Sequence, residues 1–328
     1  MSPPSTLGRW VSSGISRRRS SIFAFIVLAM LLPDPLGERA SAASGPVPLP
    51  PSGKAYFGTY SPPLNSWTQD AQKREYTQLE ANLGRSLDVA HYYYDWGASF
   101  PTWRESWHVA NGRIPMMSWG HYNTDVVRSG SQDAVIRARA DAIKAFGYPV
   151  FLRPMWEMDG TWTRTWVKSP ASFIDAWRRI HGIFKSRGAT NATFVWCPTA
   201  WGFASGEAQK YYPGNAYVDW VCADPYNWAP GRPGADWRSL AEATQPFYSW
   251  GLTTGKPLML GEYGCQERAS GEKGAWFTQA RNDLKVKFPA IRAVFYFDSY
   301  TKYDWRVDTS SSAFSAFKAM GADPYFNP

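Results

Sequence analysis

Two glutamates stand directly after two apolar segments that have the composition of buried strands. Glu157 follows Val150–Met155 and Trp156, and Glu262 follows Pro257–Gly261. Two carboxyl groups about 5–5.5 Å apart can cleave a glycosidic bond with retention of configuration: one gives a proton to the leaving oxygen and the other attacks the anomeric carbon. We predict the first glutamate as proton donor and the second as nucleophile. The alternative for either glutamate alone is a structural salt bridge with a nearby arginine.

Eight short apolar segments alternate with amphipathic segments along the chain. The predicted strands are Ala55–Tyr60, Leu87–Tyr93, Ile114–Trp119, Val150–Met155, Ala192–Cys197, Trp220–Asp224, Pro257–Gly261 and Ala293–Phe297. The clearest predicted helices are Ser66–Leu83, Gln132–Phe146, Ser172–Ser186, Trp237–Trp250, Gly274–Phe288 and Ser311–Met320. This alternation predicts an α/β fold, a single-domain (β/α)8 TIM barrel. An open doubly wound sheet is the alternative, although no glycine-rich phosphate loop follows the first strand.

The active sites of such barrels lie at the C-terminal ends of the strands. Glu157 ends the fourth predicted strand and Glu262 ends the seventh. These two strands lie on opposite sides of an eight-stranded barrel. The two carboxyl groups are therefore expected to face each other across its mouth.

The first 42 residues have the order of a signal peptide. Arg17–Arg19 form a basic region, Ile22–Leu32 form an apolar run, and Ala40–Ala42 offer a cleavage site. The run is shorter than the roughly 20 residues of a membrane span. We expect a secreted protein cleaved near Ala42, with the Sec and twin-arginine routes both open. The expected parts are a signal peptide over 1–42, a Pro/Ser/Gly-rich lead-in over 43–54 and one catalytic barrel over 55–328.

The composition narrows the class of function. The chain has 18 tryptophans, more than a core of this size needs, and indole rings stack on sugars. The leader carries +3 of the net charge of +8, and the remaining +5 is spread without a polybasic block, which favours a solvated surface over a nucleic-acid interface. The odd cysteine count of Cys197, Cys222 and Cys265 leaves at least one unpaired, with one disulfide and free thiols both open. The histidines lack metal-ligand spacing, so we expect no metal and no cofactor.

Four segments resemble, in order and spacing, motifs of glycoside hydrolase family 26, the β-mannanase family of the large barrel clan. They are Arg153–Trp162, Val218–Asn227, Pro257–Gly264 and Phe297–Arg306. The resemblance extends from about Tyr56 to Met320 and so covers nearly the whole chain after the leader.

The resemblance implies roles for further residues. The two glutamates match the acid/base and the nucleophile of the family. Tyr226 matches a tyrosine that hydrogen-bonds the nucleophile and helps to keep it ionised. Trp162 and Trp305 match aromatic residues that line the sugar subsites, and Arg153 matches a motif arginine that orients the site.

The chain departs from the family pattern beside the acid/base. The family has a histidine directly before this residue and an asparagine two residues after it, whereas this chain has Trp156 and Asp159. The histidine belongs to the subsite of the attacked sugar, so an indole there is expected to contact substrate and to change recognition. The alternative is that Trp156 packs behind the strand.

Other polar or aromatic residues also end predicted strands. Trp119 and His121 end the third strand and are predicted sugar contacts if they reach the mouth. The run His91–Tyr94 ends the second strand, and alternation directs at least two of its side chains into the core. For Asp224 and Asp298 we expect structural hydrogen bonds.

We therefore expect a monomeric, secreted endo-β-glycanase that binds polysaccharide, and neither nucleic acid nor membrane once the leader is removed. β-1,4-Mannan is the first choice of substrate, and β-1,3-xylan and mixed-linkage β-glucan are alternatives that the resemblance embraces. A non-catalytic carbohydrate-binding barrel is the rival from another class, which the presence of both glutamates and Tyr226 disfavours. Hydrolysis and transglycosylation differ only in the acceptor and are not separated by the sequence.

Overall fold

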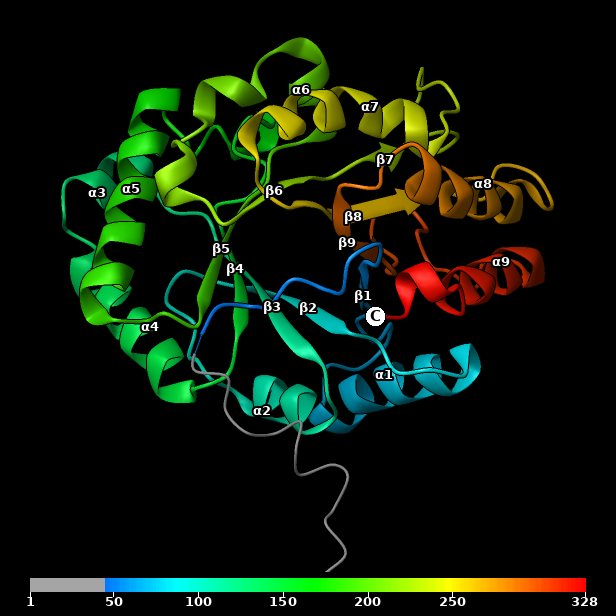
Figure 1. The fold of residues 1–328 in the computed structure, drawn as a ribbon, viewed down its shortest axis with the longest axis horizontal. Helices are drawn as coiled ribbons and strands as arrows, with labels where there is room; N and C mark the ends of the chain where they lie inside the picture. Colours follow the sequence, from blue (N-terminus) through cyan, green and yellow to red (C-terminus); the bar gives the residue numbers. More distant parts are fainter. Residues whose placement is uncertain (1–44) are drawn as a thin grey trace, which may run out of the picture. The chain divides into compact units, whose positions relative to one another are not determined.

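The computed structural model describes residues 45–328, and its centre is a closed barrel of eight parallel strands (Figure 1). The strands are β1 (Tyr56–Tyr60), β2 (Val89–Tyr94), β3 (Ile114–Trp119), β4 (Val150–Pro154), β5 (Ala192–Trp196), β6 (Trp220–Ala223), β8 (Leu258–Cys265) and β9 (Ile291–Phe297). Pairing of β6 with β8 and of β1 with β9 closes the ring. A two-residue strand, β7 (Tyr226–Asn227), pairs with the end of β8. The predicted (β/α)8 fold is confirmed, while the predicted signal peptide lies outside the described residues.

Helices surround the strands in chain order (Figure 1). They are α1 (Gln69–Leu83), α2 (Trp103–Ala110), α3 (Thr124–Arg128), α4 (Asp133–Phe146), α5 (Pro170–Arg187), α6 (Ala200–Ser205), α7 (Leu240–Gly251), α8 (Glu272–Val286) and α9 (Ser311–Gly321). The six predicted helices are present, and the short helices α2, α3 and α6 were not predicted because they span too few turns to show periodicity. Helix α7 begins later than expected because Ser239 and Glu242 form a capping box. Within residues 45–328, no helix is long and apolar enough to cross a membrane.

Side chains alternate between the inside and the outside of the barrel along each strand. Phe151 and Met259 belong to a buried cluster inside the barrel. Their neighbours Leu152 and Leu260 belong to the larger cluster between the strands and the helices. Val47, from the lead-in, joins the inner cluster. The alternation decides which strand-end residues reach the mouth of the barrel and which pack against helices.

A disulfide lies inside the barrel beneath the mouth. It joins Cys197 to Cys222 at the ends of β5 and β6, while Cys265 is a buried free thiol. Gly261 lies against it, since a Cβ there would be 2.4 Å from Cys222 Sγ and 3.0 Å from Cys197 Sγ. Only glycine fits this approach of β8, and the next residue is Glu262.

We expect Gly261→Ala to lower the free energy of unfolding by about 1–3 kcal/mol, because the added methyl group overpacks the floor of the mouth. Gly182 in α5 is a matched control, because a Cβ there meets nothing within 4 Å. Gly182→Ala should raise the stability by about 0.5–1 kcal/mol, since alanine is the better helix former. Denaturant unfolding of both variants measures the difference, and equal effects would contradict the packing argument.

Candidate active site

The end of β4 turns sharply to direct Glu157 into the mouth. Met155 and Glu157 have φ angles of 45° and 50°, a left-handed conformation that costs energy for residues other than glycine. The turn is held by hydrogen bonds from Glu157 N to Cys197 O (2.7 Å) and from Gly160 N to Glu157 O (2.8 Å). Two strained residues on either side of Trp156 are characteristic of a side chain whose position matters for chemistry.

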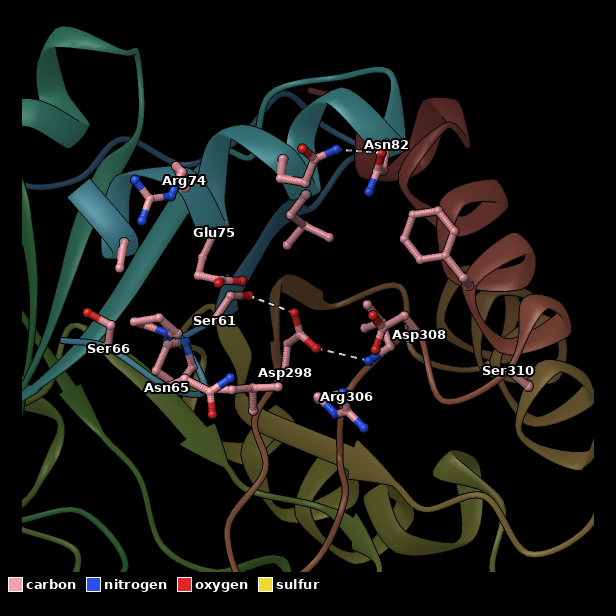
Figure 2. Close-up of a pocket in the computed structure, with 18 of the residues that line it drawn as sticks. Ser61, Asn65, Ser66, Arg74, Glu75, Asn82, Asp298, Arg306, Asp308 and Ser310 are labelled. Atoms are coloured by element: carbon pink, nitrogen blue, oxygen red, sulfur yellow. Dashed lines mark hydrogen bonds between the residues drawn. The ribbon is translucent and has the colours of Figure 1, made fainter. Parts of the chain in front are cut away.

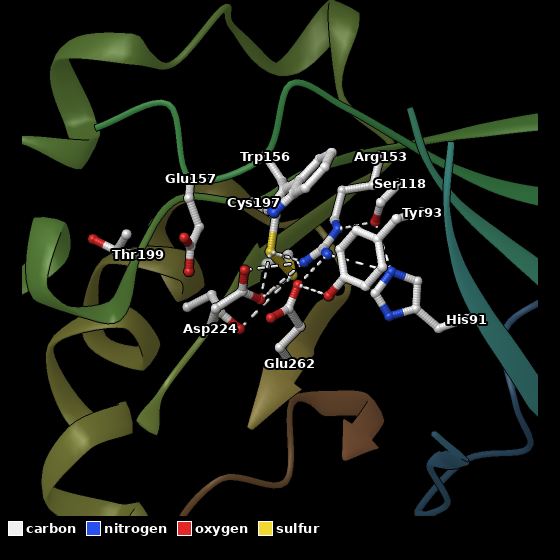
Figure 3. A network of polar contacts seen from close by, with 12 residues as sticks. His91, Tyr93, Ser118, Arg153, Trp156, Glu157, Cys197, Thr199, Asp224 and Glu262 are labelled. Carbon is white, nitrogen blue, oxygen red and sulfur yellow. Dashed lines mark hydrogen bonds and ion pairs between the residues drawn. A yellow bond between two sulfur atoms is a disulfide. The ribbon is translucent and has the colours of Figure 1, made fainter. Parts of the chain in front are cut away.

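Three donors surround the buried carboxylate of Glu262, and Figure 3 shows two of them, Tyr93 and Arg153. The Tyr226 hydroxyl donates to Oε2 at 2.7 Å and the Tyr93 hydroxyl donates to Oε1 at 2.5 Å. Arg153 Nη2 also donates to Oε1. Burial and the charge of Glu262 raise the pKa of both tyrosines well above its ordinary value, so the phenols keep their protons and donate. Such donors stabilise the ionised form of a carboxyl group.

Arg153 is fully buried at the centre of this network (Figure 3). Its Nη1 binds both oxygens of Asp224, at 3.1 and 3.0 Å, and its Nε donates to Ser118 Oγ at 2.7 Å. Burial alone would lower the pKa of Arg153, but the charges of Asp224 and Glu262 raise it above its ordinary value. The guanidinium therefore stays charged and supplies the positive charge between these two carboxylates.

Glu157 and Glu262 are close but lie in different environments. One carboxyl oxygen each of Glu157, Asp224 and Glu262 lie within 4.8 Å of one another. Burial, and then the charge of Glu262, raises the pKa of Glu157 to about 8. Glu157 therefore holds its proton near neutral pH, while Glu262 accepts hydrogen bonds from two tyrosines and Arg153. This arrangement can serve an acid and a nucleophile in one reaction.

Aromatic residues cover one side of Glu157. Trp162, which is 47% exposed, donates from Nε1 to Glu157 Oε2 at 2.7 Å. His121 Nε2 is 2.7 Å from the carbonyl oxygen of Trp156, and its ring packs on those of Trp156, Trp162 and Trp166. Burial lowers the pKa of His121 to about 4, so the imidazole is neutral at pH 7. The structure thus brings Trp156, Trp162 and His121 together beside Glu157.

Two predicted sugar contacts are wrong. Trp119 is fully buried between the strands and the helices, where its ring stacks on that of Trp96 at 4.2 Å. The alternation places its neighbour Ser118 inside and directs Trp119 towards the helices. Trp305 is 2% exposed and packs on Tyr226 at 4.8 Å, so it supports that tyrosine and presents almost no surface to a sugar.

Comparisons with known proteins identify the family. The model of glycosyl hydrolase family 26 matches residues 102–243. Endoglucanase H of Acetivibrio thermocellus is 32% identical over 254 residues, which are 73% of this chain and 28% of that protein. The chain belongs to glycosyl hydrolase family 26.

A further relative is similar over about half of this family 26 chain, and a solved structure has the same fold. Mannan endo-1,4-beta-mannosidase A and B of Caldalkalibacillus mannanilyticus is 27% identical over 165 residues, covering 48% of this chain and 29% of that protein. The family 26 β-mannanase BoMan26A of Bacteroides ovatus has the same fold, with a TM-score of 0.63 at 16% identity over 83% of this chain and 90% of that chain. The chain spans less than a third of the length of the two curated relatives.

Trp156 and Asp159, the two residues that depart from the family 26 pattern, both contact other residues of the site. Trp156 faces the mouth, because its ring packs on Tyr93 at 5.1 Å and beside the guanidinium of Arg153 at 5.4 Å. The alternative that it packs behind the strand is therefore wrong. Asp159 accepts hydrogen bonds from Thr199 N (2.9 Å) and Thr199 Oγ1 (2.6 Å), which ties the turn after Glu157 to the N-terminus of α6.

One residue of this family 26 site, Tyr93, has no role predicted from the sequence. It lies within the aromatic run His91–Tyr94. Along this strand the side chains of His91 and Tyr93 point into the barrel and that of Tyr92 points outwards, and this alternation is the signal that could have predicted Tyr93 at the mouth. The hydrogen bonds expected of Asp224 are present, but its partner Arg153 lies on β4 and is distant in sequence. No local pattern joins these two residues.

We expect Trp162→Phe to shift the alkaline limb of the pH profile of kcat/KM to higher pH. The indole N–H stabilises the ionised form of Glu157, so its loss raises the pKa of Glu157 and keeps the acid protonated further into the alkaline range. Trp166→Phe is the control, because this neighbouring, 36% exposed indole has no hydrogen bond to Glu157 among the described residues. An unchanged limb in Trp162→Phe would contradict the assignment of Glu157 as the acid.

Proposed function

We propose that this protein is a retaining endo-β-glycanase that cleaves a β-linked polysaccharide by double displacement. The observation that carries this proposal is the pair of glutamates whose oxygens lie within 4.8 Å, with the pKa of Glu157 raised to about 8 and three donors bound to Glu262. Glu157 protonates the leaving oxygen as Glu262 attacks the anomeric carbon. Glu157 then takes a proton from the water that releases the glycosyl group.

The first test removes the nucleophile. We expect Glu262→Ala to lose nearly all activity, and azide to restore part of it by forming a glycosyl azide of inverted configuration, because the small anion fills the space of the lost carboxylate. Product analysis by NMR measures this, and the wild-type enzyme should release a product of retained configuration. Wild-type release of the inverted anomer would exclude double displacement.

Glu157→Ala provides the matched comparison for this test. It should impair cleavage of the polysaccharide far more than cleavage of aryl glycosides with good leaving groups, because only a poor leaving group needs the proton. Equal losses on both kinds of substrate would assign Glu157 a structural role.

For the substrate, we propose β-1,4-mannan first. The four motifs that resemble the β-mannanase family and the mannosidase relative support it. β-Glucan is the second candidate, because the relative of higher identity is named an endoglucanase and because Trp156 replaces the family histidine. An indole only donates a hydrogen bond, whereas an imidazole can also accept one from a sugar hydroxyl.

We expect Trp156→His to shift the preference towards mannan and to lower the alkaline limb of the pH profile, because the apolar indole beside Glu157 is replaced by a polar ring. Activity on mannan, glucomannan, β-1,3-xylan and lichenan measures the preference, with the melting temperature of the same variant as control. A variant that is only less stable, with the same substrate ranking and pH profile, would contradict the contact between Trp156 and the attacked sugar.

We also propose that the enzyme is exported, loses residues 1–42 near Ala42 and acts outside the cell as a monomer. The disulfide between Cys197 and Cys222 supports export, because disulfides persist in oxidising compartments. The mass of protein recovered from the culture medium, and its size in solution, test both statements. A mass that includes the leader, or a dimer, would contradict them.

A further inference from the structure

A cavity of about 600 Å³ lies between α1 and α9 (Figure 2). Neither Glu157 nor Glu262 lines it. Its inner wall includes Ser61, just after β1, and Asp298, just after β9. Ser61 Oγ donates to Asp298 Oδ2 at 2.9 Å, and Val307 N donates to Asp298 Oδ1 at 2.9 Å, which fixes this wall. The volume is within the range of about 300–1,000 Å³ that small-molecule sites have.

Strand alternation separates this cavity from the mouth of the barrel. Tyr60 and Phe297 precede the two wall residues, and their rings pack together at 5.2 Å, with Tyr60 also 4.8 Å from Tyr93. Since Tyr93 binds Glu262, these rings are on the side of the glutamates. Ser61 and Asp298 point the other way, towards the helices. The cavity and the catalytic site thus lie on opposite sides of the same two strands.

Charged groups of both signs line the cavity (Figure 2). Within residues 45–328, the side chains of Arg74, Glu75 and Asp308 have no hydrogen-bond or ion-pair partner. Burial, and then the charge of Asp308, raises the pKa of Glu75, whereas the charge of Arg74 lowers it, so both charged groups lie close enough to act on Glu75. Asn65, Gln78 and Asn82 add amide groups to the lining. Mixed charges and amides suit a neutral ligand with many hydroxyl groups better than an ion of either sign.

The two loops that bound the cavity carry exposed aromatic rings. Trp67 is 59% exposed next to Ser66, which lines the cavity, and Tyr300 is 60% exposed two residues after Asp298. Neither ring packs against another aromatic ring of the described chain. An indole exposed beside polar groups provides a flat apolar face with hydrogen-bonding groups at its edge, which matches the faces and hydroxyls of a sugar ring.

We propose that the cavity between α1 and α9, with Trp67 at its edge, is a second saccharide-binding site that holds the polysaccharide outside the catalytic cleft. Arg74, Glu75 and Asp308 bind sugar hydroxyls there, and Trp67 covers a sugar face. The site rests on the proposed function, since its ligand is a chain of the same polysaccharide. It increases the time that the enzyme spends on polymer and takes no part in bond cleavage.

The test uses the full-length exported protein with Glu262→Gln, which allows binding without turnover. Mannohexaose and a mixed-linkage gluco-hexasaccharide are each titrated into it by calorimetry. We expect two binding sites for the hexasaccharide whose polymer the wild-type enzyme degrades. Adding Arg74→Ala and Asp308→Ala, or Trp67→Ala, should remove one site or weaken it at least roughly tenfold, equivalent to about 1.4 kcal/mol.

Lys73→Ala is the matched control for Arg74→Ala. It removes a positive charge from the adjacent position of α1, but its side chain lies over Trp103 and Trp107, at 5.6 and 6.0 Å, and does not line the cavity. This variant should keep two sites, with melting temperatures confirming that all variants are folded.

Turnover separates a second site from an extension of the cleft. In the active enzyme, Arg74→Ala with Asp308→Ala should leave kcat/KM on the hexasaccharide unchanged and reduce the rate on insoluble polysaccharide severalfold. Equal losses on both substrates would overturn the proposal, because the cavity would then belong to the cleft. A single binding site in Glu262→Gln would also overturn it while leaving the glycanase assignment intact. Absence of hydrolysis of every polysaccharide would instead reject the proposed function.

Discussion

The structure at the mouth of the barrel depends on the ion pairs of the buried guanidinium of Arg153 with Asp224 and Glu262. An unpaired charge in this position would cost several kcal/mol, and Asp224 and Glu262 together offset that cost. Burial raises the pKa of Asp224 well above its ordinary value, whereas the charge of Arg153 lowers it. The hydroxyls of Tyr93 and Tyr226 donate further hydrogen bonds to Glu262. Burial, and then the charge of Glu262, raises the pKa of Glu157, so Glu157 keeps its proton beside this network.

The backbone around this charged network adopts strained conformations and close approaches that cost conformational energy. Met155 and Glu157 take left-handed conformations, and β8 passes so close to the disulfide that Gly261 accepts no side chain. Gly264 has the same role for Tyr226, because a Cβ there would be 2.7 Å from its ring. Each constraint fixes a group that touches one of the glutamates. Packing around the disulfide and in the surrounding core keeps the strained turn and the buried charged groups in place.

The sequence was sufficient for the fold and the two glutamates because hydrophobic segments and their end residues are local signals. It was not sufficient for the direction of side chains at the strand ends. Trp119 was expected at the mouth, but a shift of one residue decides between inside and outside, and Ser118 takes the inner position. Tyr93 was missed for the same reason. Three partners of Arg153, namely Ser118, Asp224 and Glu262, lie on or just after three other strands, so only the closed barrel brings them together. The pairing of Cys197 with Cys222 also depends on β5 and β6 being neighbours.

Side chains alternate between the two faces of each strand, so one pair of strands contributes to two regions with different chemistry. At the ends of β1 and β9, Tyr60 and Phe297 form an aromatic wall on the side of the glutamates, whereas Ser61 and Asp298 form a polar wall on the side of α1 and α9. The two aromatic rings separate the charged network around Arg153 from the charged groups of the outer cavity. Changes in the loops after β1 and β9 can therefore alter the outer surface without changing the protonation of Glu157. Loops on a rigid barrel vary readily for this reason, while the inward residues of the strands are constrained by the reaction.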